Sequence, residues 1–108
     1  MAGSEGEYIY FVTSPNMETS RKLAQVVVGE KIAACVSIIP NITSIYWWKE
    51  QIEESTENLL IIKTTASNGE KLKKEIQNNH PYETPECVGF PIRDGLEKYL
   101  AWIHDSVE

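Results

Sequence analysis

The stretch HPYETPE, residues 80 to 86, places an imidazole, a phenol and two carboxylates within seven positions. His80 can bind a borderline metal ion such as Cu²⁺ or Zn²⁺, and Glu83 offers a carboxylate three residues later. The two prolines restrict the backbone at and before their own positions, which is typical of a rigid turn. We favour the rigid turn as the main role of this stretch, with His80 and Glu83 as a weak metal site.

The composition of the 108-residue chain disfavours several other functions. Its formal net charge of −6 repels phosphate backbones, so we expect no nucleic-acid partner. Its apolar runs are far shorter than the roughly 20 residues of a membrane helix, and we expect no signal peptide, no membrane association and a cytoplasmic location. Cys35 and Cys87 have neither CxxC nor zinc spacing and are expected to be free thiols.

The strands that must position these residues follow from aromatic and β-branched stretches. We predict four of them, over residues 8–13, 34–39 with a continuation through 44–48, 59–65 and 87–92. The segments on either side of Lys49-Glu50-Gln51 are expected to form one long hairpin. The far end of this hairpin is expected to be uncovered, because a chain of 108 residues has few other residues to pack against it.

Apolar residues at helical spacing predict three helices. The first runs over about 17–31 behind Asn16 as its N-cap, and the second follows a capping box of Ser67 and Glu70. The third is expected to begin behind Asp94 and to bury one apolar face. That face consists of Leu96, Tyr99, Leu100 and Ile103.

The order β-α-β-β-α-β with a further C-terminal helix predicts an α+β, ferredoxin-like sandwich with helices on one face of an antiparallel sheet. We assign residues 8–108 to this single domain and residues 1–7 to a flexible N-terminal segment. The second and fourth strands are then the edges, so Cys35 and Cys87 lie too far apart for an intrachain disulfide. Because the two edges differ, they can pair head to tail between copies, which favours a cyclic trimer.

Several of these stretches resemble one known family. They are AACVSIIPNITSIYWW (33–48), LLIIKTT (59–65), HPYETPE (80–86) and the final YLAWI (99–103). Together they make nearly the whole chain from Tyr8 similar to the CutA family of divalent-cation tolerance proteins. The resemblance implies a tight homotrimer, similar in architecture to the PII signalling proteins, and no established reaction. It also implies binding of copper or another divalent cation, while animal members are linked to anchoring of acetylcholinesterase.

Polar residues within the family motifs define a candidate ligand cleft. They are Cys35, Lys63, Tyr82 and Glu86. A buried lysine needs an acidic partner, and Glu83 or Glu86 can supply one if these residues meet at a subunit boundary.

The aromatic pair Trp47 and Trp48 marks a candidate subunit interface. Because side chains alternate along a strand, the two indoles are expected on opposite faces. One would then pack on a local core and the other on a partner subunit.

Two positions depart from the family's pattern. Lys49-Glu50-Gln51 stands where members usually carry a glycine in the hairpin turn, and Val12 stands where members with a proposed copper site carry a cysteine. A valine cannot ligate copper, so only nitrogen and oxygen donors remain and we expect weak binding.

The resulting hypothesis is a non-enzymatic homotrimer that binds a divalent cation, copper in particular, and requires no cofactor. The alternatives are a small-ligand-binding signalling trimer resembling PII proteins and a scaffold or anchoring protein whose partner the sequence does not identify. An acylphosphatase-like enzyme is disfavoured, because its phosphate loop needs glycine and arginine. Here the loop after the first strand is Ser14-Pro15-Asn16-Met17.

Overall fold

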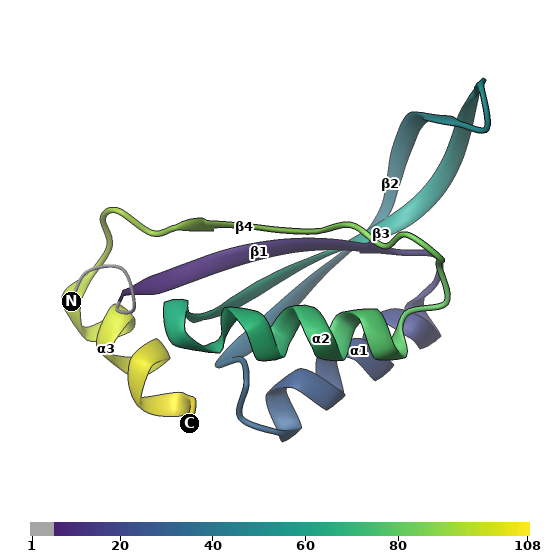
Figure 1. Ribbon diagram of the computed structural model, residues 1–108. Coiled ribbons are helices and arrows are strands. Elements are labelled where there is room, and N and C mark those ends of the chain that lie inside the picture. Colours follow the sequence, from purple (N-terminus) through teal and green to yellow (C-terminus); the bar gives the residue numbers. More distant parts are fainter. Residues whose placement is uncertain (1–5) are drawn as a thin grey trace.

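The computed structural model describes residues 6–108 and shows an α+β fold (Figure 1). The elements in chain order are β1 (Glu7–Ser14), α1 (Met17–Gly29), β2 (Cys35–Trp48), β3 (Gln51–Thr65), the 3-10 helix η2 (Ala66–Asn68), α2 (Gly69–Asn79), β4 (Cys87–Pro91) and α3 (Glu97–Ser106). β1 therefore begins at Glu7, inside the segment 1–7 that was expected to be flexible, and residues 1–5 of that segment lie outside the described residues. Among residues 6–108, no helix combines the length and the apolar character that a membrane crossing requires.

The four strands form one antiparallel sheet in the order β2-β3-β1-β4. β1 and β3 are central, which fits the apolar character of both faces of each strand. β2 and β4 are the edges, as predicted from the sequence. Cys35 lies on the first of these edges and Cys87 on the other, and both thiols are free.

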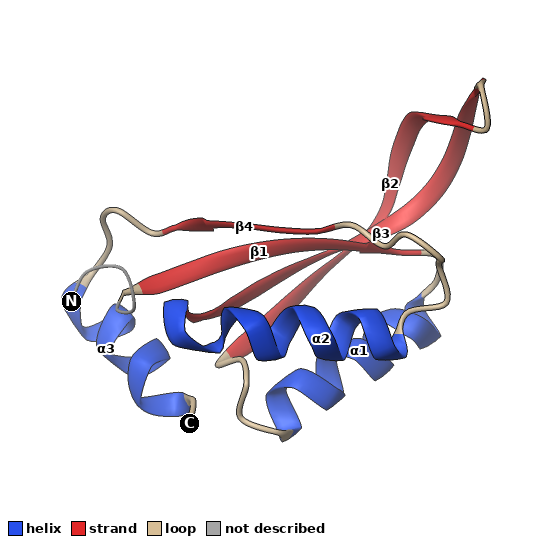
Figure 2. Cartoon of the chain, in the orientation of Figure 1, coloured by secondary structure: helices blue, strands red, loops and turns tan. Residues whose placement is uncertain are grey.

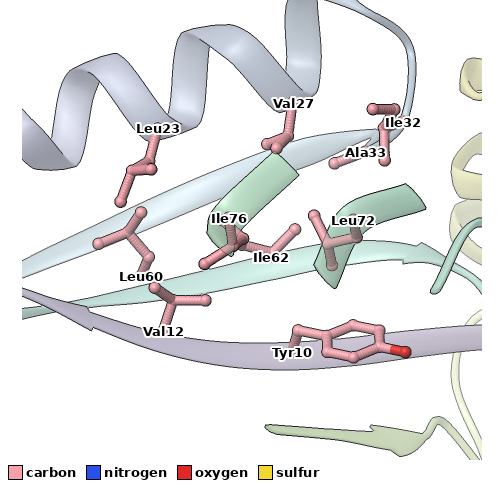
Figure 3. Packing of buried hydrophobic residues seen from close by; sticks show 10 residues of the cluster. All are labelled: Tyr10, Val12, Leu23, Val27, Ile32, Ala33, Leu60, Ile62, Leu72 and Ile76. Atoms are coloured by element: carbon pink, nitrogen blue, oxygen red, sulfur yellow. The ribbon is translucent and has the colours of Figure 1, made fainter. Parts of the chain in front are cut away.

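One face of the sheet is covered by α1 and α2, and the core lies between them and the strands (Figures 1 and 3). The buried apolar side chains of this layer are Tyr10, Val12, Leu23, Val27, Ile32, Ala33, Leu60, Ile62, Leu72 and Ile76. Those from β1 and β3 occur at every second residue, those from α1 and α2 occur at helical spacing, and Ile32 and Ala33 come from the connection between α1 and β2.

Tyr10 is held in this core by two glycines. A Cβ atom added to Gly69 would stand 2.5 Å from the Tyr10 hydroxyl oxygen, and one added to Gly89 would stand 2.6 Å from both Cδ2 and Cζ of the ring. Any larger residue at either position must therefore displace the ring or the backbone. The tyrosine thus fixes how closely α2 and β4 approach the middle of the sheet.

The opposite face of the sheet carries apolar side chains that the helices α1 and α2 do not reach. Phe11 meets Phe90 edge to face with ring centroids 5.3 Å apart. Toward the two edges this face stays open, since Ile39, Val88 and Phe90 are exposed by 44%, 53% and 42%. Contiguous exposed apolar surface is a common feature of interaction sites.

β2 and β3 continue past the body of the molecule as a two-stranded ribbon, which we call the arm (residues 42–57). Figure 2 shows the arm as two strands joined by a turn at the tip, with no helix beside it. The pairing of β2 with β3 shifts at a bulge between Ile39 and Ile42, where Asn41 has a φ of 63°. Pro40 therefore precedes an irregularity and does not end the strand, and the predicted continuation through 44–48 is confirmed.

The arm closes with the tight turn predicted at this point. β2 ends at Trp48 and β3 begins at Gln51, so Lys49 and Glu50 form the loop. Their φ values are 50° and 66°. The positive φ angles of both residues match a type I′ turn. Such turns usually contain asparagine and glycine, because positive φ is unfavourable for most residues with a Cβ atom.

Two predicted helix starts are wrong. Ser67 lies within η2 and its hydroxyl contacts the Thr65 hydroxyl, so the expected capping box does not form and Asn68 precedes α2. α3 starts at Glu97 behind Leu96, and Asp94 does not cap it. The 3-10 turn moves the start of α2 by one residue, and the entry without a side-chain cap moves the start of α3 by two residues.

The predicted buried face of α3 is also mostly wrong. Ile103 is fully buried, whereas Leu96 is 81% exposed, Tyr99 is 41% exposed and Leu100 is half-buried. α3 packs across the end of the sheet rather than on the main core, as its place in Figure 1 shows. α1 ends at Gly29, two residues before the expected boundary.

Candidate functional site

The HPYETPE loop connects α2 to β4, and His80 fixes its start. His80 is 8% exposed; its Nε2 donates to the Thr13 carbonyl oxygen at 2.7 Å and its Nδ1 accepts from the Tyr82 amide at 3.1 Å. The second bond identifies Nδ1 as the unprotonated nitrogen. The imidazole therefore ties the loop to the end of β1, which is the structural role that the sequence favoured for this stretch.

The Tyr82 side chain connects the same loop to the base of the arm. Its hydroxyl donates to Oε2 of Glu57 at 2.8 Å, and Glu57 is only 7% exposed. Burial, followed by the bond to Glu57, raises the pKa of Tyr82 well above its ordinary value. The phenol thus remains a protonated donor toward a buried carboxylate.

A cavity of about 760 Å³ opens between the arm and this loop. Its lining residues are Thr13, Ser44, Ile45, Tyr46, Trp47, Trp48, Ser55, Glu57, Tyr82, Glu83, Thr84 and Glu86. Trp47 and Trp48 are exposed by 71% and 43%, so neither indole is covered by a local core, contrary to expectation. The volume is within the range that binds small molecules, and one wall is aromatic while the other is acidic.

A second cluster lies at the far end of the sheet, where Cys35 of β2 and Lys63 of β3 are paired residues. Cys35 Sγ lies 3.8 Å from the Tyr99 hydroxyl, and Lys63 Nζ lies 5.9 Å from the centre of the Tyr99 ring. Burial, then the contact with the Cys35 thiol, raises the pKa of Tyr99. α3 therefore contributes a residue that completes this cluster.

The residues predicted for one ligand cleft thus form two groups within the chain. Cys35 and Lys63 are at one end, and Tyr82 and Glu86 line the cavity at the other. Lys63 follows Leu59, the β3 partner of the cavity residue Thr13, by four residues, or roughly 13 Å at 3.3 Å per residue. The acidic partner expected for Lys63 from Glu83 or Glu86 is not supplied within the chain, where Tyr99 is its neighbour instead.

Comparison with known proteins agrees with this architecture. Residues 8–106 match the model of the family described as CutA1 divalent ion tolerance protein. The chain belongs to the CutA1 family.

Relatives within the CutA1 family share much of the sequence. The chain is 43% identical over 98 residues to the rice protein CutA 1, chloroplastic, covering 91% of this chain and 55% of that protein. It is 41% identical over 100 residues to the divalent-cation tolerance protein CutA of Thermus thermophilus, covering 93% and 97%. The chain spans about half the length of the rice, Arabidopsis and mouse relatives that it matches.

Solved CutA1 structures superpose closely on the chain. The rice CutA1 crystal structure has a TM-score of 0.93 at 39% identity, covering 100% of this chain and 98% of that one. The Thermus thermophilus structure has a TM-score of 0.92 at 40% identity, covering 94% and 99%. The family is named for tolerance of divalent cations and not for a reaction.

A divalent cation of the kind named by the CutA1 family needs a set of converging ligands from the protein. Within residues 6–108, no three His, Cys, Asp or Glu side chains converge as a metal site would require. Both ring nitrogens of His80 are hydrogen-bonded, and the Val12 side chain is fully buried in the core. A single CutA1 chain in this conformation therefore does not fit a tight metal centre.

Sequence reasoning missed Glu57 and Tyr99. Glu57 and Asn58 lead directly into LLIIKTT, whose apolar residues alternate to both faces, so two polar residues there must be buried with partners. That local pattern was sufficient to mark Glu57. No local signal exists for Tyr99, because its contact with Cys35 joins residues 64 positions apart.

Proposed function

We propose that this CutA1-family chain is a non-enzymatic, cytoplasmic homotrimer of ferredoxin-like subunits that binds divalent cations, copper in particular, as part of metal tolerance. The match of residues 8–106 to a family described by divalent ion tolerance carries this proposal. The strand order β2-β3-β1-β4 with helices on one face supports the ferredoxin-like arrangement.

Exposed apolar surface supports a trimeric assembly. The arm exposes Ile45 by 66%, Trp47 by 71% and Ile52 by 65%, and the open sheet face exposes further apolar side chains. The long edge β2 and the short edge β4 differ, so an edge of one copy meets an unlike surface of the next and the contacts close into a ring. Light scattering is expected to give the mass of three chains at micromolar concentration, and a stable monomer would contradict this assembly.

The two separated groups of cleft residues suit a site shared between subunits. Cys35 and Lys63 of one copy would lie opposite Tyr82 and Glu86 of its neighbour, which would give Lys63 the acidic partner that residues 6–108 of its own chain do not supply. Lys63→Met is expected to weaken the trimer, whereas Lys98→Met, an exposed change on α3, is expected to leave the mass unchanged.

Copper binding is proposed to be weak and to involve His80 and Glu83. A bound ion must take a ring nitrogen from Thr13 or from the Tyr82 amide, so metal binding competes with the loop's own hydrogen bonds. Calorimetry with Cu²⁺ on metal-free protein, with wild type and His80→Ala compared, tests this. Tight binding that disappears in His80→Ala while the trimer persists would show that the metal role outweighs the structural one.

The cytoplasmic location is a separate part of the proposal. One solved relative is titled the periplasmic divalent cation tolerance protein CutA from Archaeoglobus fulgidus, and plant relatives are named chloroplastic. Fractionation of cells that express the full natural protein distinguishes these compartments. Recovery outside the cytoplasm would refute the proposed location and would leave the proposals on the trimer and on metal binding unchanged.

A further inference from the structure

The bulge at the base of the arm places two residues of β2, Pro40 and Asn41, opposite a single residue of β3, Asn58. Pro40 has no backbone N–H, so the Asn41 amide is the only main-chain donor between the paired residues Ile39 and Ile42. That amide donates to the side-chain oxygen of Asn58 at 3.2 Å. One side chain of β3 therefore supplies the acceptor at the point where the pairing of the two strands is interrupted.

The other end of the Asn58 side chain reaches α1. Its amide nitrogen donates to Ser20 Oγ at 3.0 Å. Because a main-chain N–H can only donate, the oxygen of Asn58 must face Asn41 and the nitrogen must face Ser20. Asn58 is 6% exposed and Ser20 is fully buried. The two ends of one buried amide group thus connect the helix layer to the bulge.

The Ser20 hydroxyl is itself surrounded by partners. It donates to the Asn16 carbonyl oxygen at 2.8 Å and lies 2.7 Å from Oγ of Ser14, the fully buried last residue of β1. With its proton on Asn16, its two lone pairs accept from Ser14 and Asn58, so every hydrogen-bonding site of the hydroxyl is used. We call Ser14, Ser20 and Asn58 the junction cluster.

A polar cluster at this place does more than fill the end of the core. Two residues away along the same strands, the paired positions carry the apolar residues Val12 and Leu60. A buried polar network that is fully satisfied selects one geometry, because any other arrangement leaves a buried donor or acceptor unpaired. The geometry selected here is that of α1 and the end of β1 relative to the bulge.

We propose that the junction cluster is a latch that sets the direction in which the arm leaves the body, with Asn58 as the positioning residue between α1 and the bulge. A bulge determines how a strand pair bends and twists, and Figure 1 shows the arm rising at an angle to β1. The hydrogen bond from Asn41 holds that residue at its φ of 63°. All contacts of the latch lie within one chain, so it requires neither a bound metal nor a particular assembly.

Residual dipolar couplings of the main-chain amides measure the direction of the arm relative to β1. They are recorded by NMR on the isotopically labelled, metal-free protein in the assembly that it forms. In the wild type, one alignment tensor is expected to fit β1 and the arm together. Ser20→Ala removes the acceptor of Asn58, so the arm couplings are expected to deviate from that tensor and to shrink as the arm samples several directions. The Asn41 amide proton signal is expected to shift upfield as its hydrogen bond weakens.

Thr64→Val is the matched control, because it removes another buried hydroxyl and keeps the size of the side chain. That hydroxyl donates to the Ile32 carbonyl oxygen, away from the arm. Both variants are expected to lower the unfolding free energy, whereas only Ser20→Ala is expected to change the arm couplings.

Asn58→Asp tests the same contact from the other side. It keeps an acceptor for the Asn41 amide and replaces the donor toward Ser20 by an oxygen, so the arm couplings are expected to change as in Ser20→Ala. Ser20→Ala alone decides the matter if the buried carboxylate prevents folding.

Two results would overturn the proposal. Arm couplings that still fit the wild-type tensor in Ser20→Ala would show that the cluster fills the end of the core without directing the arm. Equal changes in Thr64→Val would show that any loss of core stability loosens the arm. Neither readout depends on copper or on the number of chains in the assembly, so the latch can fail while the proposed function holds.

Discussion

Gly69 and Tyr10 can be tested in a double-mutant cycle. The position of the Tyr10 hydroxyl oxygen determines the sign of the coupling free energy between the two substitutions. In Gly69→Ala the new Cβ would stand 2.5 Å from the Tyr10 hydroxyl oxygen but 3.6 Å from Cζ, the ring carbon that carries it. The first distance is a severe overlap and the second an ordinary contact. Removing the oxygen by Tyr10→Phe therefore removes the overlap and leaves the ring in place.

The magnitude follows from this geometry. Overpacking a core of this kind costs about 1–3 kcal/mol, and Tyr10 has little space to withdraw because Gly89 borders its ring. In the Tyr10→Phe background, Gly69→Ala is expected to be neutral or stabilising by several tenths of a kcal/mol, since Gly69 has helical dihedral angles and alanine is the better helix residue. The coupling between the two sites is then about 2 kcal/mol.

Urea unfolding of the four proteins at one chain concentration measures the effect, because assembly makes stability concentration-dependent. With the m-value of a domain of this size, 2 kcal/mol shifts the midpoint by about 1 M. Gly89→Ala is the matched control. Its Cβ overlaps ring carbons rather than the oxygen, so Tyr10→Phe is not expected to rescue it. If Gly69→Ala destabilises both backgrounds equally, the hydroxyl is not the obstacle and the account of this core is wrong.

Three further predictions concern the loop and its surroundings. Tyr82→Phe removes the donor to buried Glu57 and is expected to lower the unfolding free energy by about 1–3 kcal/mol. Tyr46→Phe removes an exposed contact of 3.2 Å with Ser55 and should change the unfolding free energy little. Equal losses in the two variants would show that the bond to Glu57 contributes no more than an exposed contact. His80→Ala is expected to weaken the trimer and to remove only weak copper binding, as measured by light scattering and calorimetry. Burial raises the pKa of Cys87 from 9.0 to about 11, so its alkylation by iodoacetamide at pH 8.5 should be about 100-fold slower in the folded than in the unfolded chain, and equal rates would contradict this. Because that pKa is raised on folding, the thiol's contribution to stability is present below pH 9.0 and is lost as pH rises toward about 11, an effect that Cys87→Ala should remove from the pH profile of unfolding.

The fold was predictable wherever an apolar pattern faces the chain's own core. The continuous apolar, β-branched stretches over residues 8–13 and 59–65 located the central strands, and the stripe of Leu23 and Val27 located α1. α3 shows the limit of this rule. Its spacing predicted a buried face, yet Leu96 is 81% exposed, because a periodic stripe indicates that something covers it and not that the same chain does.

The candidate site was predictable only in part, for a similar reason. The prolines and the histidine of HPYETPE indicated a rigid loop, and the local bonds of His80 match that interpretation. The position of Tyr82 against Glu57 depends on a contact across 25 residues, which no local pattern contains. The bulge at Asn41 also involves a distant contact, because the Asn41 amide donates to the side chain of Asn58, 17 residues away.

The bulge at Asn41 also divides the molecule into regions that should differ in how readily their amides exchange with solvent. Up to that point β2 and β3 share a core with two helices. Beyond it they have each other and, at the base of the arm, the bond from Tyr82 to Glu57, and a lone two-stranded ribbon is at best marginally stable in water. In an isolated chain the arm is thus expected to open in local fluctuations that leave the body closed. Deuterium uptake in the arm would then fall steeply with increasing chain concentration, while uptake in β1 stayed constant. The last structure to become fixed in this protein would be the segment that its own helices do not cover.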